Sequence, residues 1–178
     1  SEFLVPPAIW VSDIGTNSIW MTQGYRHKSG ARFIGAWGNG PMGYALPASG
    51  GAYYASKDSM IVVTTGDGGF QMNIQELQII AANQIPAKIF VLNNKCYANV
   101  KTGARAQFGG RAHATEIGFG YSVPDFVKVA EAYGIKAFNL SGKDKIIDKI
   151  QQALLMQEPV LINVEIDPEQ VAPDYSDF

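Results

Sequence analysis

The sequence has one cysteine, little charge and no long apolar run, and each of these absences excludes a class of protein. Cys96 has no partner for an internal disulfide, which fits a reducing compartment. The net charge is −2, so no basic field is available to bind nucleic acid or an anionic membrane. No segment resembles a signal peptide or has the length and apolarity of a membrane span, and we therefore expect a cytoplasmic protein.

What the sequence does contain is enough apolar material for one domain. Of the 178 residues, 47% are hydrophobic, and a chain of this length can bury most of its apolar surface without disulfides. We expect residues 1–7 to be a linker or a cloning remnant and residues 8–167 to form the domain. Pro168 and Pro173 predict that residues 168–178 form an irregular tail.

Two continuous apolar runs predict the centre of a parallel sheet. Residues 60–65 and 88–92 are apolar and rich in β-branched side chains, which is typical of strands buried on both faces. Between them, apolar residues recur at helical spacing and predict a helix that opens at Phe70 and ends before Pro86: Phe70, Ile74, Leu77 and Ala81. A strand, a helix and a strand in this order predict a right-handed crossover.

The remaining periodic segments predict the rest of the fold. They are strands at 9–11, 32–34, 136–139 and 159–166, and helices at 18–25, 124–133 and 145–156. Residues 101–121 have no usable period, and we expect a long loop there. The predicted class is an α/β fold with a doubly wound, mainly parallel sheet and helices on both faces.

Polar residues follow both buried strands where each strand ends. Gly66-Asp67-Gly68 comes after the first strand and Asn93-Asn94 after the second, so an Asp and an Asn should meet at the carboxyl edge of the sheet. Their oxygens suit a hard cation that carries a diphosphate, and Gly66, Gly68 and Gly69 would let the backbone approach the phosphates. Either motif alone is ambiguous, because both also occur as ordinary turns.

Together the two motifs resemble the thiamine diphosphate signature. Residues 66–72 and 74–77 are similar to the carboxyl-terminal cofactor domain, or PP domain, of acetolactate synthase and its relatives. The resemblance runs from about Val11 to Asp167 and includes residues 109–111 and 123–134. It implies the thiamine diphosphate-binding fold, with thiamine diphosphate and Mg²⁺ as cofactors.

The resemblance also implies roles for individual residues. Asp67 and Asn94 would be side-chain ligands of Mg²⁺, and the backbone carbonyl of Cys96 a third, with diphosphate and water completing an octahedron. Thr16-Asn17 would hydrogen-bond the diphosphate, and Met42 would hold the cofactor bent. The implied cofactor-binding residues are Thr16, Asn17, Gly40, Met42, Gly66, Asp67, Gly68, Gly69, Asn94, Cys96, Tyr97, Ala98 and Asn99.

Two other interpretations of these segments are less well supported. Residues 38–43 match the glycine pattern of dinucleotide-binding loops, but Pro41 and Pro47 fall where the phosphate-binding helix should begin and continue. Cys96 could be a nucleophile, but no histidine is fixed near it by sequence, and its carbonyl at the metal is the simpler role.

The segment 95–111 carries four cations and no acidic residue: Lys95, Lys101, Arg105 and Arg111. A solvated loop is the default interpretation of such a segment. The sharper hypothesis is a lid whose cations meet the carboxylate of a 2-oxo acid substrate.

The resemblance implies decarboxylation of a 2-oxo acid by the thiazolium ylid and transfer of the resulting acyl anion equivalent. The glutamate that activates the cofactor is expected on a pyrimidine-binding domain, in the same or a separate polypeptide of a homo-oligomeric enzyme. We therefore expect no catalytic residue in this chain and no activity from the chain alone. Residues 95–101 depart from the usual synthase sequence, so a simple decarboxylase, a C–C lyase or hydrolase of the same superfamily, or a non-catalytic binding module stay open.

Overall fold

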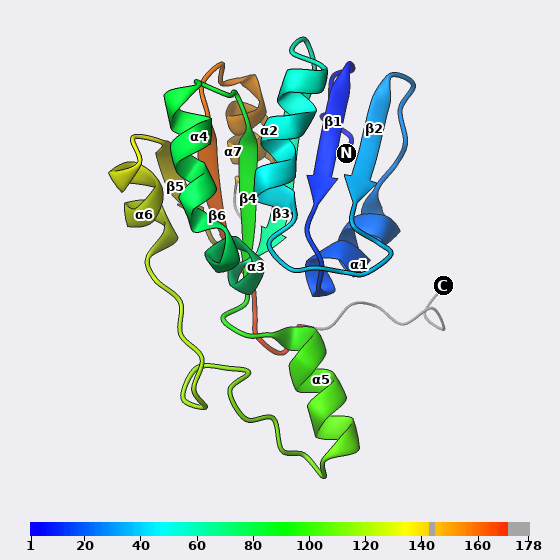
Figure 1. Cartoon of the computed structure of the whole chain (residues 1–178), viewed down its shortest axis with the longest axis vertical. Coiled ribbons are helices and arrows are strands. Elements are labelled where there is room, and N and C mark those ends of the chain that lie inside the picture. The colour runs from blue at the N-terminus through cyan, green and yellow to red at the C-terminus, as the bar shows by residue number, and fades with distance from the viewer. Residues whose placement is uncertain (143–144, 171–178) are drawn as a thin grey trace.

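The apolar runs of the sequence form the centre of a six-stranded sheet (Figure 1). The computed structural model describes residues 1–142 and 145–170. The strands are β1 (Ala8–Ser12), β2 (Ala31–Gly35), β3 (Met60–Gly66), β4 (Lys88–Asn93), β5 (Lys136–Leu140) and β6 (Val160–Glu165). Their order is β2-β1-β3-β4-β6-β5, and every neighbouring pair is parallel, which confirms the predicted strands and sheet.

Helices cover both faces of this sheet. They are α1 (Thr16–Gly24), α2 (Ala45–Ala55), α3 (Asp67–Met72), α4 (Leu77–Ala82), α5 (Ala98–Gln107), α6 (Phe126–Ala132) and α7 (Ile146–Leu155), with a 3₁₀ turn at Ile74–Glu76. One core cluster lies between the sheet and α2, α4 and α6, where Leu46, Leu77 and Phe126 are buried. On the other face, Ala153 of α7 is buried, and Met21 of α1 and Ile150 of α7 line a shared cavity. The doubly wound α/β architecture is confirmed.

The direction of winding reverses between β1 and β3. β1 pairs with β2 on one side and with β3 on the other, and Ser12 at the end of β1 lies beside Thr64 of β3. Connections that leave such a point in opposite directions open a crevice at the carboxyl ends of the strands, where α/β proteins bind their ligands. In Figure 1, α5 lies beyond this edge of the sheet.

The helix between β3 and β4 differs from the prediction. It begins at Asp67 rather than Phe70, and it is broken at Asn73, whose φ of −133° is not helical. The Asn73 side-chain amide donates to the carbonyl oxygen of Gly43 over 2.8 Å. The crossover is therefore divided into α3 and α4 at a residue that is bound to the loop carrying Met42.

Helix α2 was not expected from the sequence. Its third residue is Pro47, which the sequence analysis treated as a sign against a helix at this position. Proline is tolerated in the first turn of a helix because the backbone N–H groups there have no intrahelical acceptor. Pro47 was therefore no evidence against a helix at this position. The glycines at 38–43 still do not form a dinucleotide-binding loop, because they follow β2 and not β1.

The prediction of a loop over residues 101–121 is wrong for residues 101–107. Residues Ala98–Gln107 form α5, of which only Lys101 is buried, so no apolar stripe marked the helix in the sequence. Residues 108–121 contain no helix or named strand, as expected, and α6 begins at Phe126, two residues later than the predicted helix.

The ends of the described segments bear on two further expectations. Pro168–Gln170 is irregular, while residues 171–178 of the predicted tail, like Lys143 and Asp144, lie outside the described residues. Within residues 1–142 and 145–170, no helix combines the length and apolarity that a membrane span requires.

Candidate functional site

A pocket opens at the carboxyl edge of the sheet, between the ends of β1, β3 and β4. All residues that the sequence predicted to bind a cofactor line it except Gly40. Gly40 belongs to the loop that carries Met42, and a Cβ there would lie 3.5 Å from Ile14. The pocket also includes residues that the sequence analysis did not single out: Ile14, Gly15, Trp20, Leu92 and Val100.

Asp67 is the carboxylate of this pocket. It follows β3 directly and is 2% exposed. Burial raises the pKa of Asp67 to about 6, and a hydrogen bond from the Tyr121 hydroxyl to Oδ2, 3.1 Å long, acts in the opposite direction. A cation at this carboxylate would favour its charged form, because opposite charges lower the pKa of an acid.

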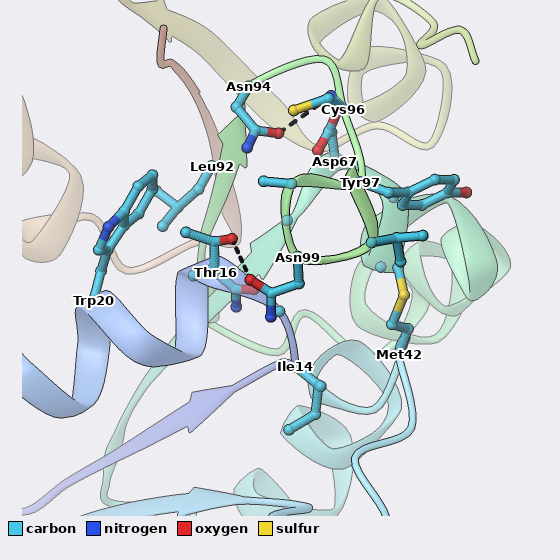
Figure 2. A pocket seen from close by; sticks show the side chains of 17 residues that line it. Ile14, Thr16, Trp20, Met42, Asp67, Leu92, Asn94, Cys96, Tyr97 and Asn99 are labelled. Carbon is cyan, nitrogen blue, oxygen red and sulfur yellow. Dashed lines mark hydrogen bonds between the residues drawn. The ribbon is translucent and has the colours of Figure 1, made fainter. Parts of the chain in front are cut away.

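Asn94 and Cys96 follow β4 and face the same pocket (Figure 2). Between them Lys95 has a φ of 58°, a left-handed conformation that turns the chain sharply. The Asn94 Oδ1 atom accepts a hydrogen bond from the Cys96 backbone N–H over 3.3 Å. Burial raises the pKa of the Cys96 thiol to about 11, and its Sγ donates to the carbonyl of Pro168 over 3.7 Å. A buried, protonated thiol is a poor nucleophile, which argues against catalysis by this side chain.

Thr16 and Asn17 occupy the opposite wall, at the start of α1. The Thr16 hydroxyl donates to Oδ1 of Asn99 over 2.7 Å, so the loop after β1 meets the first turn of α5 (Figure 2). Asn17 is buried and donates from Nδ2 to the Asp13 carbonyl over 3.2 Å. The two residues are therefore held at the pocket by bonds to Asn99 and to the end of β1.

Met42 and Tyr97 cover the backbone of Gly68. A Cβ on Gly68 would lie 2.2 Å from Tyr97 Cε1 and 3.2 Å from Met42 Cε. Only glycine leaves room for these two side chains, which Figure 2 shows next to each other at the pocket. Met42 belongs to neither core cluster, so it lines the pocket and does not fill the core.

Asp13 organises the pocket from beneath, and the sequence analysis gave it no role. It is 1% exposed, and its Oδ1 accepts from the backbone N–H of Ile14 over 2.7 Å and of Gly43 over 3.0 Å. Its Oδ2 accepts from the Thr65 hydroxyl over 3.0 Å and from the Ala45 N–H over 3.4 Å. Burial raises the pKa of Asp13, while these four donors lower it. One carboxylate thus joins the end of β1, the end of β3 and the loop of Met42.

Two of the four cations of the predicted lid, Lys101 and Arg105, form ion pairs with glutamates. Lys101 is 3% exposed and pairs with Glu116, 2.8 Å from its Oε2, and with Glu169. Arg105 pairs with the same two glutamates, each at 3.2 Å. Neither cation lines the pocket, so the lid hypothesis is not supported for Lys101 and Arg105.

Comparison with known proteins identifies the family. Residues 13–164 match the family model described as "Thiamine pyrophosphate enzyme, C-terminal TPP binding domain". The chain belongs to this family. Thiamine pyrophosphate is another name for thiamine diphosphate, so the resemblance noted in the sequence is confirmed.

Individual relatives of this thiamine pyrophosphate domain carry the name acetolactate synthase large subunit. The chain is 38% identical to a probable acetolactate synthase large subunit of Methanocaldococcus jannaschii, over 93% of the chain and 27% of that protein. It is 35% identical to the large subunit of Pyropia yezoensis, over 92% of the chain and 27% of that protein. It is 33% identical to the acetolactate synthase isozyme 2 large subunit of Escherichia coli K12, over 88% of the chain and 28% of that protein. The chain thus spans about a quarter of the length of these relatives.

The residues present fit a diphosphate with a hard cation. The pocket is lined by Asp67, Asn94 and Cys96, which carry a carboxylate, an amide oxygen and a backbone carbonyl, and these are the kinds of oxygen donor that Mg²⁺ takes. Among the described residues no three His, Cys, Asp or Glu side chains gather as a metal site of their own. A cation in this thiamine pyrophosphate domain would therefore need further oxygens, which a diphosphate and water can supply.

Proposed function

We propose that this domain binds the diphosphate of thiamine diphosphate together with Mg²⁺, in an acetolactate synthase-like enzyme. The enzyme would decarboxylate a 2-oxo acid and transfer the acyl anion equivalent. The observation that carries the proposal is one pocket, in a domain of the thiamine pyrophosphate family, that unites Asp67, Asn94 and Cys96. The names of the relatives support the synthase-like reaction.

Each wall of the pocket has a part in binding. Asp67, Asn94 and the Cys96 carbonyl would ligate Mg²⁺, which holds the diphosphate in turn. The Thr16 hydroxyl and the Asn17 amide can donate hydrogen bonds to phosphate oxygens once they exchange their present acceptors. The backbone of Gly66, Gly68 and Gly69 completes the binding surface, because the absence of a side chain allows close approach.

The side chains that cover Gly68 would set the direction in which the rest of the cofactor extends from its diphosphate. Met42 and Tyr97 form this cover, and Met42 would support the bent cofactor. When bound, thiamine diphosphate supplies the electron sink for the loss of CO₂. The chain's own residues bind and orient, and the activating glutamate would come from a pyrimidine-binding domain in the same or a separate polypeptide.

The direct test is calorimetric titration of the chain with thiamine diphosphate in the presence and absence of Mg²⁺. We expect saturable binding that needs Mg²⁺, and loss of that binding in Asp67→Ala, because the only carboxylate among the proposed ligands is gone. Circular dichroism should show the same secondary structure for both proteins.

Asp125→Ala is the matched control, because Asp125 caps α6 and lies outside the pocket. It should bind as the unsubstituted chain does. Unchanged binding in Asp67→Ala would defeat the metal assignment, and absence of any binding by the unsubstituted chain would defeat the proposed function.

A further inference from the structure

The carboxylate of Asp67 has a partner that comes from outside the strands and helices. Tyr121 lies in the connection between α5 and α6, and its hydroxyl donates to Asp67 Oδ2 over 3.1 Å. Tyr121 is 7% exposed, so solvent does not compete freely for this bond. The two partners are 54 positions apart in the sequence.

A second side chain donates to the Tyr121 hydroxyl. Gln71 lies four residues after Asp67 on α3, and its Nε2 donates to the Tyr121 oxygen over 3.3 Å. The same Nε2 also donates to the backbone carbonyls of Asp67 and Ser122, over 3.4 and 3.5 Å. Since Gln71 already supplies a proton to that oxygen, the hydroxyl's own proton is free to point at Asp67. The Tyr121 ring also packs against Tyr97, with 4.4 Å between the ring centroids.

The backbone around Tyr121 is tied to the segment that carries the other proposed ligands. The Tyr121 N–H donates to the Glu116 carbonyl over 3.3 Å, and Glu116 forms an isolated β-bridge with Cys96. Glu116 is also one of the acceptors of the buried Lys101. The backbone of Tyr121 is therefore connected to Cys96 through Glu116, while its side chain bonds to Asp67.

From these contacts we propose that Tyr121 is a positioning residue for the cation site. Its hydroxyl donates to Oδ2 of Asp67 and, together with the backbone N–H groups of Gly68 and Lys95, holds the carboxylate in the orientation that the cation needs. The inference rests on the proposed function, because it assumes that Asp67 ligates Mg²⁺. Hydrogen-bond partners of metal ligands commonly contribute about 10- to 100-fold to metal affinity.

The choice of metal separates positioning from simple structural support. Mg²⁺ demands a near-ideal octahedron, whereas Ca²⁺ accepts irregular geometry and longer bonds. A carboxylate that has lost the Tyr121 donor is oriented less firmly, and it should therefore lose Mg²⁺ more than Ca²⁺. A general collapse of the pocket would weaken both cations alike.

The experiment is a titration of Mg²⁺, and separately of Ca²⁺, into the chain with thiamine diphosphate present. Tyr121→Phe keeps the ring and removes the hydroxyl, and we expect Mg²⁺ to bind about 10- to 100-fold more weakly, with a clearly smaller loss for Ca²⁺. Tyr133→Phe is the matched control, because Tyr133 packs at the end of α6 away from the pocket. It should change neither affinity.

A second variant keeps the inference testable if Tyr121→Phe does not fold. Gln71→Met removes the side chain that donates to the hydroxyl, and it should lower Mg²⁺ affinity in the same selective way but by less. If the variants bound Mg²⁺ as tightly as the unsubstituted chain, the positioning role of Tyr121 would be overturned and the proposed function would stand. Equal losses for Mg²⁺ and Ca²⁺ would reduce Tyr121 to structural support. No Mg²⁺-dependent binding by the unsubstituted chain would overturn the proposed function and this inference with it.

Discussion

At the scale of single residues, Asp13 shows how one buried carboxylate can hold a site together. It accepts four hydrogen bonds from three segments of the chain, and none of these donors is charged. A buried carboxylate is costly unless its oxygens are satisfied, so the backbone of the Met42 loop is bound firmly to the end of β1. The position of Met42 therefore depends on a residue that need not touch the cofactor.

Asp13→Asn tests this dependence with no change in side-chain size. The new NH₂ group faces either the N–H groups of Ile14 and Gly43 or the Thr65 hydroxyl and the Ala45 N–H, so at least one backbone N–H loses its acceptor. We expect a loss of about 1–3 kcal/mol in the free energy of unfolding, measured with urea, and weaker binding of thiamine diphosphate.

The control for Asp13→Asn is Asp148→Asn, because Asp148 is exposed on α7. In Asp148→Asn, the free energy of unfolding and the affinity for thiamine diphosphate should be unchanged. If Asp13→Asn also left both quantities unchanged, Asp13 would not be the residue that holds the Met42 loop.

The sequence predicted the residues of the pocket better than the residues that support them. Asp67 and Asn94 stand in motifs at the ends of recognisable strands, so the parallel fold brings them to one edge. Asp13 and Tyr121 act through partners up to 52 and 54 residues away. A single Asp or Tyr has no pattern that reveals such a contact, and only the folded chain shows it.

At the scale of elements, the strands were predictable and some helices were not. Strands β3 and β4 are buried on both faces, so their sequences are continuously apolar. Helix α5 buries only Lys101, and the glutamates that pair with Lys101 and Arg105 lie outside the helix, one of them beyond β6. Periodicity cannot show a helix whose stabilising contacts are ion pairs with distant segments.

Lys101→Met tests whether this ion-pair network holds α5 in place. The substitution leaves Glu116 and Glu169 with Arg105 alone. We expect the amides of α5 to exchange hydrogen faster, with a loss of about 1–2 kcal/mol in local stability, less than for a fully buried pair because Glu169 is exposed. Exchange in β3 and β4 should stay as it is.

Lys128→Met is the matched control for α5, since Lys128 forms an exposed pair with Asp125 on α6. Hydrogen exchange measured by mass spectrometry should show no change in α5 for this variant. Faster exchange across the whole chain in Lys101→Met would mean that the network supports the entire fold and not α5 in particular.

At the scale of the whole molecule, the domain supplies one binding pocket, and we expect the group that activates the cofactor to come from another domain. The chain spans about a quarter of the length of its acetolactate synthase relatives. We expect the 178 residues alone to release no CO₂ from a panel of 2-oxo acids with thiamine diphosphate and Mg²⁺ present. Turnover at roughly 1 per second or faster, the range of ordinary enzymes, and its loss in Asp67→Ala would contradict this expectation.

The pairing of β1 with β3 has a consequence for the order of events during folding. These strands are neighbours in the sheet, yet the whole of α1, β2 and α2 lies between them in the chain. The chain must lose the entropy of closing that long loop before Asp13 can meet Thr65. We therefore expect the pocket to be completed late in folding, so that thiamine diphosphate does not template the early steps. It acts instead as a ligand of the finished domain, which raises the melting temperature by mass action.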